Sequence, residues 1–178
     1  EELLKRFEAE AQIAAHLDHP NIVRVCGSGL CKDGPYLVQE YLEGEDLADV
    51  IARRDALSLG ERLALLVQIA RGLGYAQSQG VVHRDVCPSN IRVLPNGDLK
   101  LVDFGLAVDT SGSAPDHRDD FIVGTPSSMA PEQFEGRTRD FGPWTDLYAL
   151  GCLAHRLVCR RHPFAPRDEV ALREAHRT

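Results

Sequence analysis

A strand–turn–strand segment in the middle of the chain, with a polar motif on either side, most constrains how this sequence can fold. Aliphatic residues at 91–94 and 99–102 predict two short strands, and the Pro-Asn-Gly-Asp sequence at 95–98 is typical of a tight turn between them. Before the first strand the chain reads His-Arg-Asp-Val-Cys-Pro-Ser-Asn at 83–90, and after the second it reads Asp-Phe-Gly at 103–105. The residues that carry chemistry are therefore expected on both sides of this pair of strands.

The first quarter of the chain is predicted to hold one helix and two strands. Apolar residues three and four positions apart predict a helix over 2–18, which a His-Pro-Asn sequence at 19–21 ends, because the residue before a proline avoids the α conformation. Runs at 22–26 and 36–42 predict two strands, with turn residues at 32–35 between them.

The next segments are predicted to be helical. Asp46 is expected to cap a short helix that ends near Arg54. Ser58, with Glu61 three residues later, has the spacing of a capping box and predicts the start of a longer helix that Gly80 ends.

A long aperiodic segment separates these elements from the C-terminal helices. Residues 106–129 are rich in Ser, Thr, Gly, Pro and Asp, and a loop of that length within a compact domain is usually functional. Apolar spacing predicts a helix from Trp144 until the His-Pro-Phe sequence at 162–164, and another within 167–178.

The composition is that of a globular protein and excludes several classes of function. The chain has 178 residues, a net charge of −7 and 43% hydrophobic residues. The acidic balance argues against non-specific nucleic-acid binding, so we expect no nucleic-acid partner. No apolar run approaches the roughly 20 residues of a membrane helix, and the amphipathic start does not read as a signal peptide, so we expect no membrane segment in this chain. Five cysteines without a CxxC pair indicate a reduced, cytoplasmic protein.

Three motifs occur in a fixed order along the chain. They are H-R-D-x-x-x-x-N at 83–90, D-F-G at 103–105 and A-P-E at 130–132. Each is weak alone, but the five-residue spacing from Asp85 to Asn90 and the strand–turn–strand that follows make the combination specific. With these motifs the chain resembles a eukaryotic-type Ser/Thr protein kinase, most like the bacterial members of that superfamily, over essentially its whole length.

The resemblance implies an α+β, protein-kinase-like bilobal fold, which we expect to be incomplete. Residues 1–42 would form a partial N-lobe with the αC helix, two strands and the hinge, and residues 43–178 a partial, mostly helical C-lobe. The glycine-rich loop and the strand lysine of the family would precede residue 1, and the arginine that normally pairs with Glu132 would follow Thr178. We therefore expect the 178-residue chain alone to be inactive and to bind ATP poorly.

The motif residues take their expected roles from the family. Asp85 would accept or orient the proton of the substrate hydroxyl. Asn90 and Asp103 would supply hard oxygen ligands to Mg²⁺, which bridges the phosphates of ATP. His83 and Phe104 would be structural. This set suits phosphoryl transfer, which needs positioning and charge neutralisation more than covalent help.

Residues outside the motifs are assigned by their position relative to the family. Glu10 sits where kinases place the glutamate of the αC helix. The backbone of Glu40 and Leu42 would meet adenine at the hinge, with Gln39 as the gatekeeper. Asp146, at the start of the central helix, would support the catalytic-loop backbone from below.

The activation segment carries a further set of expectations. Thr125 matches the substrate-facing threonine of the family, and Glu132 belongs to the A-P-E motif. Arg84 provides a fork that can grip an acidic group. A carboxylate of Asp119 or Asp120 is expected to supply that group without a phosphate, and phosphorylation of a serine or threonine of the segment, such as Thr110, Ser111 or Ser127, is the alternative.

Two residues depart from the family pattern. Cys87 stands where Ser/Thr kinases carry the lysine that contacts the γ-phosphate, and loss of one positioned cation could cost about 3 kcal/mol of transition-state stabilisation. Arg92 stands where the family usually places an apolar side chain under adenine. Because a buried guanidinium without a partner is costly, Arg92 must reach solvent, pair with an acid or reshape the pocket.

These observations leave a leading hypothesis and two alternatives. The leading one is an ATP- and Mg²⁺-dependent Ser/Thr kinase that acts on a protein substrate. A pseudokinase that serves as a regulatory or scaffolding module is the main alternative, supported by Cys87 and Arg92. A small-molecule phosphotransferase of related fold is disfavoured by Arg84 and by the A-P-E motif.

Overall fold

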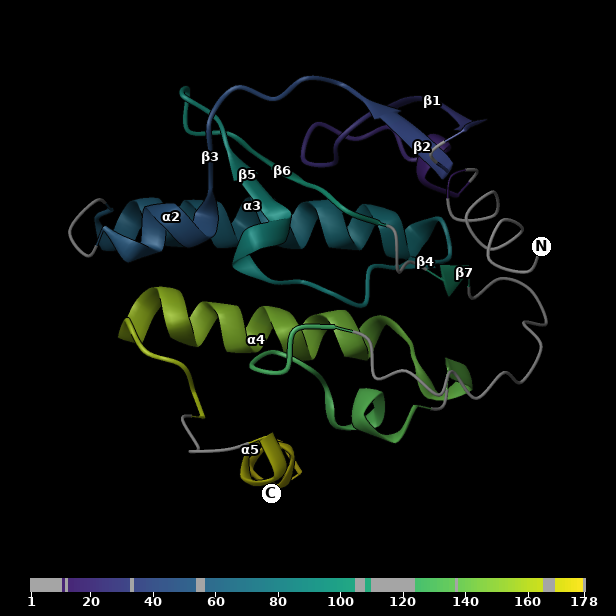
Figure 1. Cartoon of the computed structure of the whole chain (residues 1–178). Coiled ribbons are helices and arrows are strands. Elements are labelled where there is room, and N and C mark those ends of the chain that lie inside the picture. Colours follow the sequence, from purple (N-terminus) through teal and green to yellow (C-terminus); the bar gives the residue numbers. More distant parts are fainter. Residues whose placement is uncertain are drawn as a thin grey trace.

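The computed structural model combines two long helices with three small sheets (Figure 1). The elements are β1 (Val25–Cys31), β2 (Gly34–Gln39), β3 (Glu45–Asp46), α2 (Leu47–Ala52), α3 (Leu59–Ser78), β4 (Val81–Val82), η1 (Pro88–Asn90), β5 (Ile91–Val93), β6 (Leu99–Leu101), β7 (Val108–Asp109), η2 (Pro131–Glu135), η3 (Thr138–Asp140), α4 (Pro143–Cys159) and α5 (Glu169–Ala175). The residues that the structure describes are 11, 13–32, 34–53, 57–104, 108–109, 124–136, 138–164 and 169–177.

The strands form local pairs that are arranged around the helices. β1 and β2 make an antiparallel hairpin, β3, β5 and β6 make a three-stranded sheet, and β4 pairs with β7. In Figure 1, α3 and α4 lie alongside each other, the β1–β2 hairpin lies on the α3 side and α5 lies on the far side of α4. The helix pair therefore separates the hairpin from the C-terminal elements.

Helix α3 has the start and the end that the sequence predicts. The Ser58 side chain accepts a hydrogen bond from Glu61 N, and the Glu61 carboxylate accepts one from Ser58 N at 2.7 Å, which completes the capping box. The helix ends at Ser78, and Gly80 follows with a φ of +75°, a left-handed conformation that glycine adopts without steric cost.

One apolar core joins α3, α4 and the β5–β6 hairpin. Ile69 of α3, Leu101 of β6 and Leu153 of α4 are each at most 2% exposed and belong to the same cluster. Burial of such side chains stabilises the fold by about 1.5–3 kcal/mol each. This core fixes the β5–β6 hairpin against the helix pair. The hairpin itself is the one that the turn residues at 95–98 predict.

The two N-terminal strands differ in their bounds from the prediction. β1 runs over Val25–Cys31 rather than 22–26, and β2 begins at Gly34 and ends at Gln39. Ile22 and Val23 are buried and attach to β6 instead: Ile22 forms a parallel bridge with Leu101, and Val23 N donates to Leu101 O at 2.9 Å. The prediction of this strand was wrong because β1 contains two glycines and a serine, which carry little strand signal. Its backbone pairing with β2, rather than its side chains, makes this segment a strand.

Helix ends also differ from the prediction by a few residues. Residues 13–15 are helical and His16 forms a turn, so the first helix ends before residue 18, and residues 2–10 lie outside the described part of the chain. α4 ends at Cys159, where Arg160 adopts a left-handed φ of +57°. None of the helices in the described residues has both the length and the apolar character needed to cross a bilayer.

Asn21 and Lys100 attach the segment before β1 to the rest of the molecule. The Asn21 amide donates to Gln68 Oε1 on α3 and to Leu99 O on β6, both at 3.0 Å. Lys100 Nζ lies 2.6 Å from Glu40 Oε1 and donates to Ile22 O at 3.2 Å. The sheet, the helix and the chain that follows β2 are therefore held together by polar contacts as well as by the core.

We expect Ser58→Ala to lower the free energy of unfolding by about 1 kcal/mol, because Glu61 N loses its hydrogen-bond acceptor at the helix start. Urea unfolding followed by circular dichroism measures the change. Ser78→Ala, which removes a hydroxyl that bonds Tyr75 O at the other end of α3, is the matched control. Equal losses in the two variants would show that the capping box has no particular weight.

Glu40 predicts a pH-dependent contribution to stability. Partial burial raises the pKa of the Glu40 carboxyl, but hydrogen bonds from Lys100 and Arg24 N and the nearby positive charges lower it more, so the pKa lies below its ordinary value. The stabilisation is therefore present above the ordinary carboxyl pKa and is lost as the pH falls through the depressed value. We expect Glu40→Gln to cost about 1 kcal/mol of unfolding free energy near pH 7.

Denaturant titrations of Glu40→Gln and wild type at several pH values test this expectation. The difference between them should shrink as the pH falls through the depressed pKa, because the carboxyl is then protonated in both the folded and the unfolded protein. The exposed Glu43, substituted in the same way, serves as the control and should show little difference at any pH. A Glu40→Gln effect that grows as the pH falls would contradict the assignment.

Candidate active site

His83 begins the catalytic segment and is completely buried. Its Nε2 donates to Val102 O at 3.1 Å, since a carbonyl oxygen can only accept, and its Nδ1 accepts from Asp85 N at 3.4 Å. The ring lies 4.4 Å from the ring of Phe104, which is 4% exposed. These contacts couple the segment at 83–90 to the strand end that leads into Asp103.

A buried carboxylate on α4 holds the next two backbone amides. Asp146 Oδ2 accepts from His83 N and Asp146 Oδ1 accepts from Arg84 N, both at 2.8 Å. Burial raises the pKa of Asp146, against the opposing effect of these two N–H donors and of the nearby charges. This is the contact with the His83-Arg84 backbone that the sequence predicts for Asp146.

Arg84 occupies a conformation that non-glycine residues rarely adopt. Its φ is +70°, which costs about 1–2 kcal/mol for a residue with a Cβ. Its guanidinium lies over the Phe141 ring at 4.6 Å, and its carbonyl accepts a hydrogen bond from Gln133 Nε2 at 2.7 Å. The hydrogen bond from Arg84 N to Asp146 and the one from Gln133 to Arg84 O stabilise this turn, which sets the direction of the Asp85 side chain.

Both oxygens of the Asp85 carboxylate have hydrogen-bond partners. Oδ1 accepts from Thr125 N at 2.9 Å and from Thr125 Oγ1 at 2.8 Å. Oδ2 accepts from Asn90 Nδ2 at 2.9 Å, and the same nitrogen lies 3.0 Å from Asp85 O. Because its nitrogen is engaged by Asp85, the Asn90 amide is oriented and its oxygen is directed away from that carboxylate.

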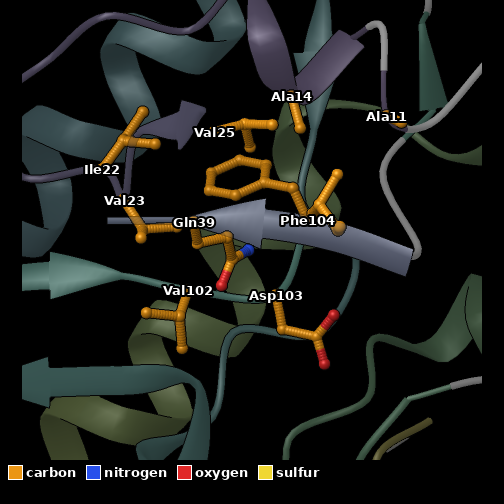
Figure 2. A pocket seen from close by; sticks show the side chains of 10 residues that line it. Ala11, Ala14, Ile22, Val23, Val25, Gln39, Val102, Asp103 and Phe104 are labelled. Carbon is orange, nitrogen blue, oxygen red and sulfur yellow. The ribbon is translucent and has the colours of Figure 1, made fainter. Parts of the chain in front are cut away.

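A cavity of about 440 Å³ lies between the hairpin, the first helix and the strand end at 102–104 (Figure 2). Most of its lining is apolar, and Asp103 supplies a carboxylate, from a backbone with a φ of +61°. Gln39 lines the cavity from β2, and Figure 2 shows Val25 and the Phe104 ring near each other on one side of it. Among the described residues, those that line the cavity are Ala11, Ala14, Ile22, Val23, Val25, Leu37, Gln39, Val102, Asp103 and Phe104.

The two departures from the family pattern have clear surroundings. Cys87 is 1% exposed and its Sγ lies 3.2 Å from Ser89 Oγ, so a buried, short side chain stands where a lysine was expected. Arg92 NH1 pairs with Asp46 Oδ1 at 3.0 Å, across the register of β5 and β3. Of the three outcomes open to Arg92, the structure has the ion pair with an acid. Arg92 is not among the residues that line the cavity of Figure 2.

The same ion pair corrects the role predicted for Asp46. This residue occupies the N-cap position of α2, but its side chain makes no capping hydrogen bond. The carboxylate faces Arg92 instead, because the β3–β5 pairing places the two residues opposite each other. α2 itself ends at Ala52, and residues 54–56 lie outside the described part of the chain.

The predicted hinge residues are structured but do not line the cavity. Glu40 N donates to Arg24 O at 2.9 Å, and the Glu40 carboxylate is engaged by Lys100 and by Arg24 N. Leu42 is half-buried. Three predicted site residues, Glu10, Asp119 and Asp120, lie outside the described residues.

Thr145 and Gln133 are two polar residues of the site that the sequence did not indicate. Glu132 Oε1 accepts from Thr145 Oγ1 at 2.7 Å, where the sequence had suggested an arginine partner beyond the chain. Gln133, 3% exposed, accepts from Ala130 N at 2.9 Å through Oε1 and bonds Arg84 O through Nε2. The spacing of three between Ala130 and Gln133, typical of a helix start, was the one available signal.

Comparison with known proteins agrees with this geometry. The family described as protein kinase domain matches residues 1–177. The serine/threonine-protein kinase PknA of Mycobacterium tuberculosis is 40% identical over 169 residues, which are 92% of this chain and 38% of PknA. A probable serine/threonine-protein kinase of Clostridium perfringens is 35% identical over 176 residues, or 99% of this chain and 25% of that protein. The kinase pkn3 of Myxococcus xanthus is 34% identical over 186 residues, with 100% of this chain and 34% of pkn3 covered.

The chain thus spans between 25% and 38% of the length of these relatives. The family match extends over nearly all of it and includes every element that builds the site around Asp85. With its mixed α and β architecture, the chain belongs to the protein kinase domain family.

Proposed function

We propose that the protein to which this chain belongs transfers the γ-phosphate of ATP to Ser or Thr hydroxyls of protein substrates. The observation that carries the proposal is the 2.8 Å hydrogen bond from a threonine hydroxyl, Thr125 Oγ1, to Asp85 Oδ1. A carboxylate oxygen that accepts a hydrogen bond from a hydroxyl at this distance has the geometry of a general base for the same kind of group. The relatives named serine/threonine-protein kinases support this substrate class.

Asp85 would accept the proton of the substrate hydroxyl while the hydroxyl oxygen attacks phosphorus. The bond from Asn90 Nδ2 to Oδ2 keeps the carboxylate from rotating. The bonds from Asp146 keep the backbone before it in place, so that little reorganisation is needed during transfer. In this proposal Arg84 and Thr125 belong to the site that receives the protein substrate.

The cavity of about 440 Å³ fits part of a nucleotide that has an apolar base and charged phosphates. Its walls are mostly apolar, and among the described residues that line it only Asp103 carries a carboxylate. Asp103 and the amide oxygen of Asn90 form a donor set of hard oxygens, which suits Mg²⁺, and these two residues would hold it. Bound Mg²⁺ would neutralise negative charge on the phosphates. Contacts of ATP with Glu10 and with the backbone of Glu40 and Leu42 remain predictions.

The proposed setting is the cytoplasm, and the proposed partners are ATP and a protein substrate. All five cysteines are free thiols, which supports a reducing compartment. The Cys26 and Cys31 side chains lie in the exposed β1 strand and form no disulfide with each other.

We expect Asp85→Asn in the full-length protein to lower the rate of phosphate transfer by about 10²- to 10⁴-fold, because the hydroxyl proton loses its acceptor. Asp103→Ala should abolish transfer by removing a metal ligand. A radiolabelled ATP assay with a generic protein substrate measures both. Asp98→Asn, in the turn between β5 and β6, is the control and should keep the wild-type rate. Full activity in Asp85→Asn would refute the proposed base.

We expect Cys87→Lys to raise the rate of transfer by about tenfold or more, because it adds a cation where the phosphates would lie. Cys87→Met, which adds bulk without charge, is the matched control and should not raise the rate. The same assay decides between the proposal and the pseudokinase alternative. Transfer by wild type supports an enzyme, whereas transfer by Cys87→Lys alone supports a pseudokinase.

A further inference from the structure

Gln133 connects two parts of the site that lie far apart in the sequence. It belongs to η2, directly after the Ala-Pro-Glu motif, and its side chain is 3% exposed. Its Nε2 donates to Arg84 O at 2.7 Å, and its Oε1 accepts from Ala130 N at 2.9 Å. One amide group thus bonds the catalytic segment and the segment at 124–130 at the same time.

The partner of Gln133 in the catalytic segment is the peptide that most needs support. Arg84 has a left-handed φ of +70°, and its N–H is already bonded to Asp146. The bond from Gln133 to Arg84 O holds the opposite side of the same residue. Asp85 follows directly, so a rotation at Arg84 would move its carboxylate.

The segment at 124–130 is held at both of its ends. At its start, Thr125 N and Oγ1 donate to Asp85 Oδ1, and at its end Ala130 N donates to Gln133. Gly124, with a φ of +127°, lies so close that an added Cβ would be 3.3 Å from Gln133 Nε2 and 3.4 Å from Arg84 O. This contact leaves little space for the segment to shift relative to Arg84.

We propose that Gln133 is a positioning residue that sets the distance between the Asp85 carboxylate and the substrate-facing segment at 124–130. The inference rests on the proposed function, in which Asp85 is the base and Thr125 lies beside the substrate hydroxyl. Gln133 acts through the Arg84 carbonyl on one side and the Ala130 amide on the other. Its effect should therefore fall on the rate of transfer rather than on nucleotide binding.

Two substitutions in the full-length protein test the inference. Gln133→Glu keeps the acceptor for Ala130 N but sets a carboxylate oxygen against Arg84 O, and Gln133→Met keeps the length while it removes both bonds. We expect each to lower kcat for a protein substrate by about tenfold to a hundredfold. KM for ATP should stay within about twofold, because the cavity residues are unchanged. The Thr125 amide should exchange with deuterium faster than in wild type in both variants, and the Ala130 amide should do so in Gln133→Met, which removes its acceptor.

Gln68 provides the matched control. Its Oε1 also accepts hydrogen bonds from two separate segments, through Asn21 Nδ2 and Leu99 N. These partners belong neither to the segment at 83–90 nor to the segment at 124–130. Gln68→Glu and Gln68→Met should lower the melting temperature without lowering kcat of the folded protein. If the Gln133 variants lose only melting temperature, or lose kcat and ATP affinity together, Gln133 is merely structural and the inference is overturned.

Hydrogen exchange separates this inference from the proposed function. If wild type transfers no phosphate, the kinase proposal fails, and the exchange rates at 124–130 then decide the role of Gln133. Faster exchange there in both variants, with α3 unchanged, supports the inference. Unchanged exchange at Thr125 and Ala130 overturns it.

Discussion

The site depends on one buried carboxylate. Asp146 accepts hydrogen bonds from the backbone amides of His83 and Arg84. It lies at the start of α4, which places Ala149, Leu153 and Leu157 in the central core. A carboxylate that accepts two N–H groups in a buried setting forms strong, charge-assisted bonds with fixed directions. The conformation of Arg84, and through it the direction of Asp85, follows from this anchor. The position of α4 thereby determines the position of the candidate base.

A second set of contacts attaches the cavity and the candidate metal ligands to the same core. Asn90 directly precedes β5 and Asp103 follows β6, so both lie at the open end of this antiparallel hairpin, where Ile91 pairs with Leu101. The buried residue Leu101 also receives the chain at Val23. The candidate base, the candidate metal ligands and the cavity are therefore all attached to a hairpin that packs on α3. Their separations are set by backbone pairing and the core rather than by long side chains.

Local patterns in the sequence predicted a large part of this arrangement. The capping box of α3, the turn at 95–98 and the neighbours Asp85 and Asn90 depend on residues within a few positions of each other, so spacing alone reveals them. Motif order then indicated the family, and the roles of the motif residues came from that resemblance.

Contacts between distant residues could not be found in this way. Asp46 with Arg92, Gln133 with Arg84 and Thr145 with Glu132 are pairs in which neither residue is unusual locally. The bounds of β1 were missed for a related reason, because a glycine-containing exposed strand owes its conformation to its partner strand. The division into lobes at residue 42 remains a prediction.

The left-handed backbone at Arg84 and Asp103 means that this protein trades stability for function at its centre. Both residues have a positive φ, which glycine would adopt without steric cost, yet each carries a side chain on which the site depends. Selection for stability alone would favour glycine at both positions and would erase a candidate metal ligand and the guanidinium that lies over Phe141. Variants selected for thermal stability should therefore retain Arg84 and Asp103, because the backbone conformation there favours glycine while the proposed site requires a side chain.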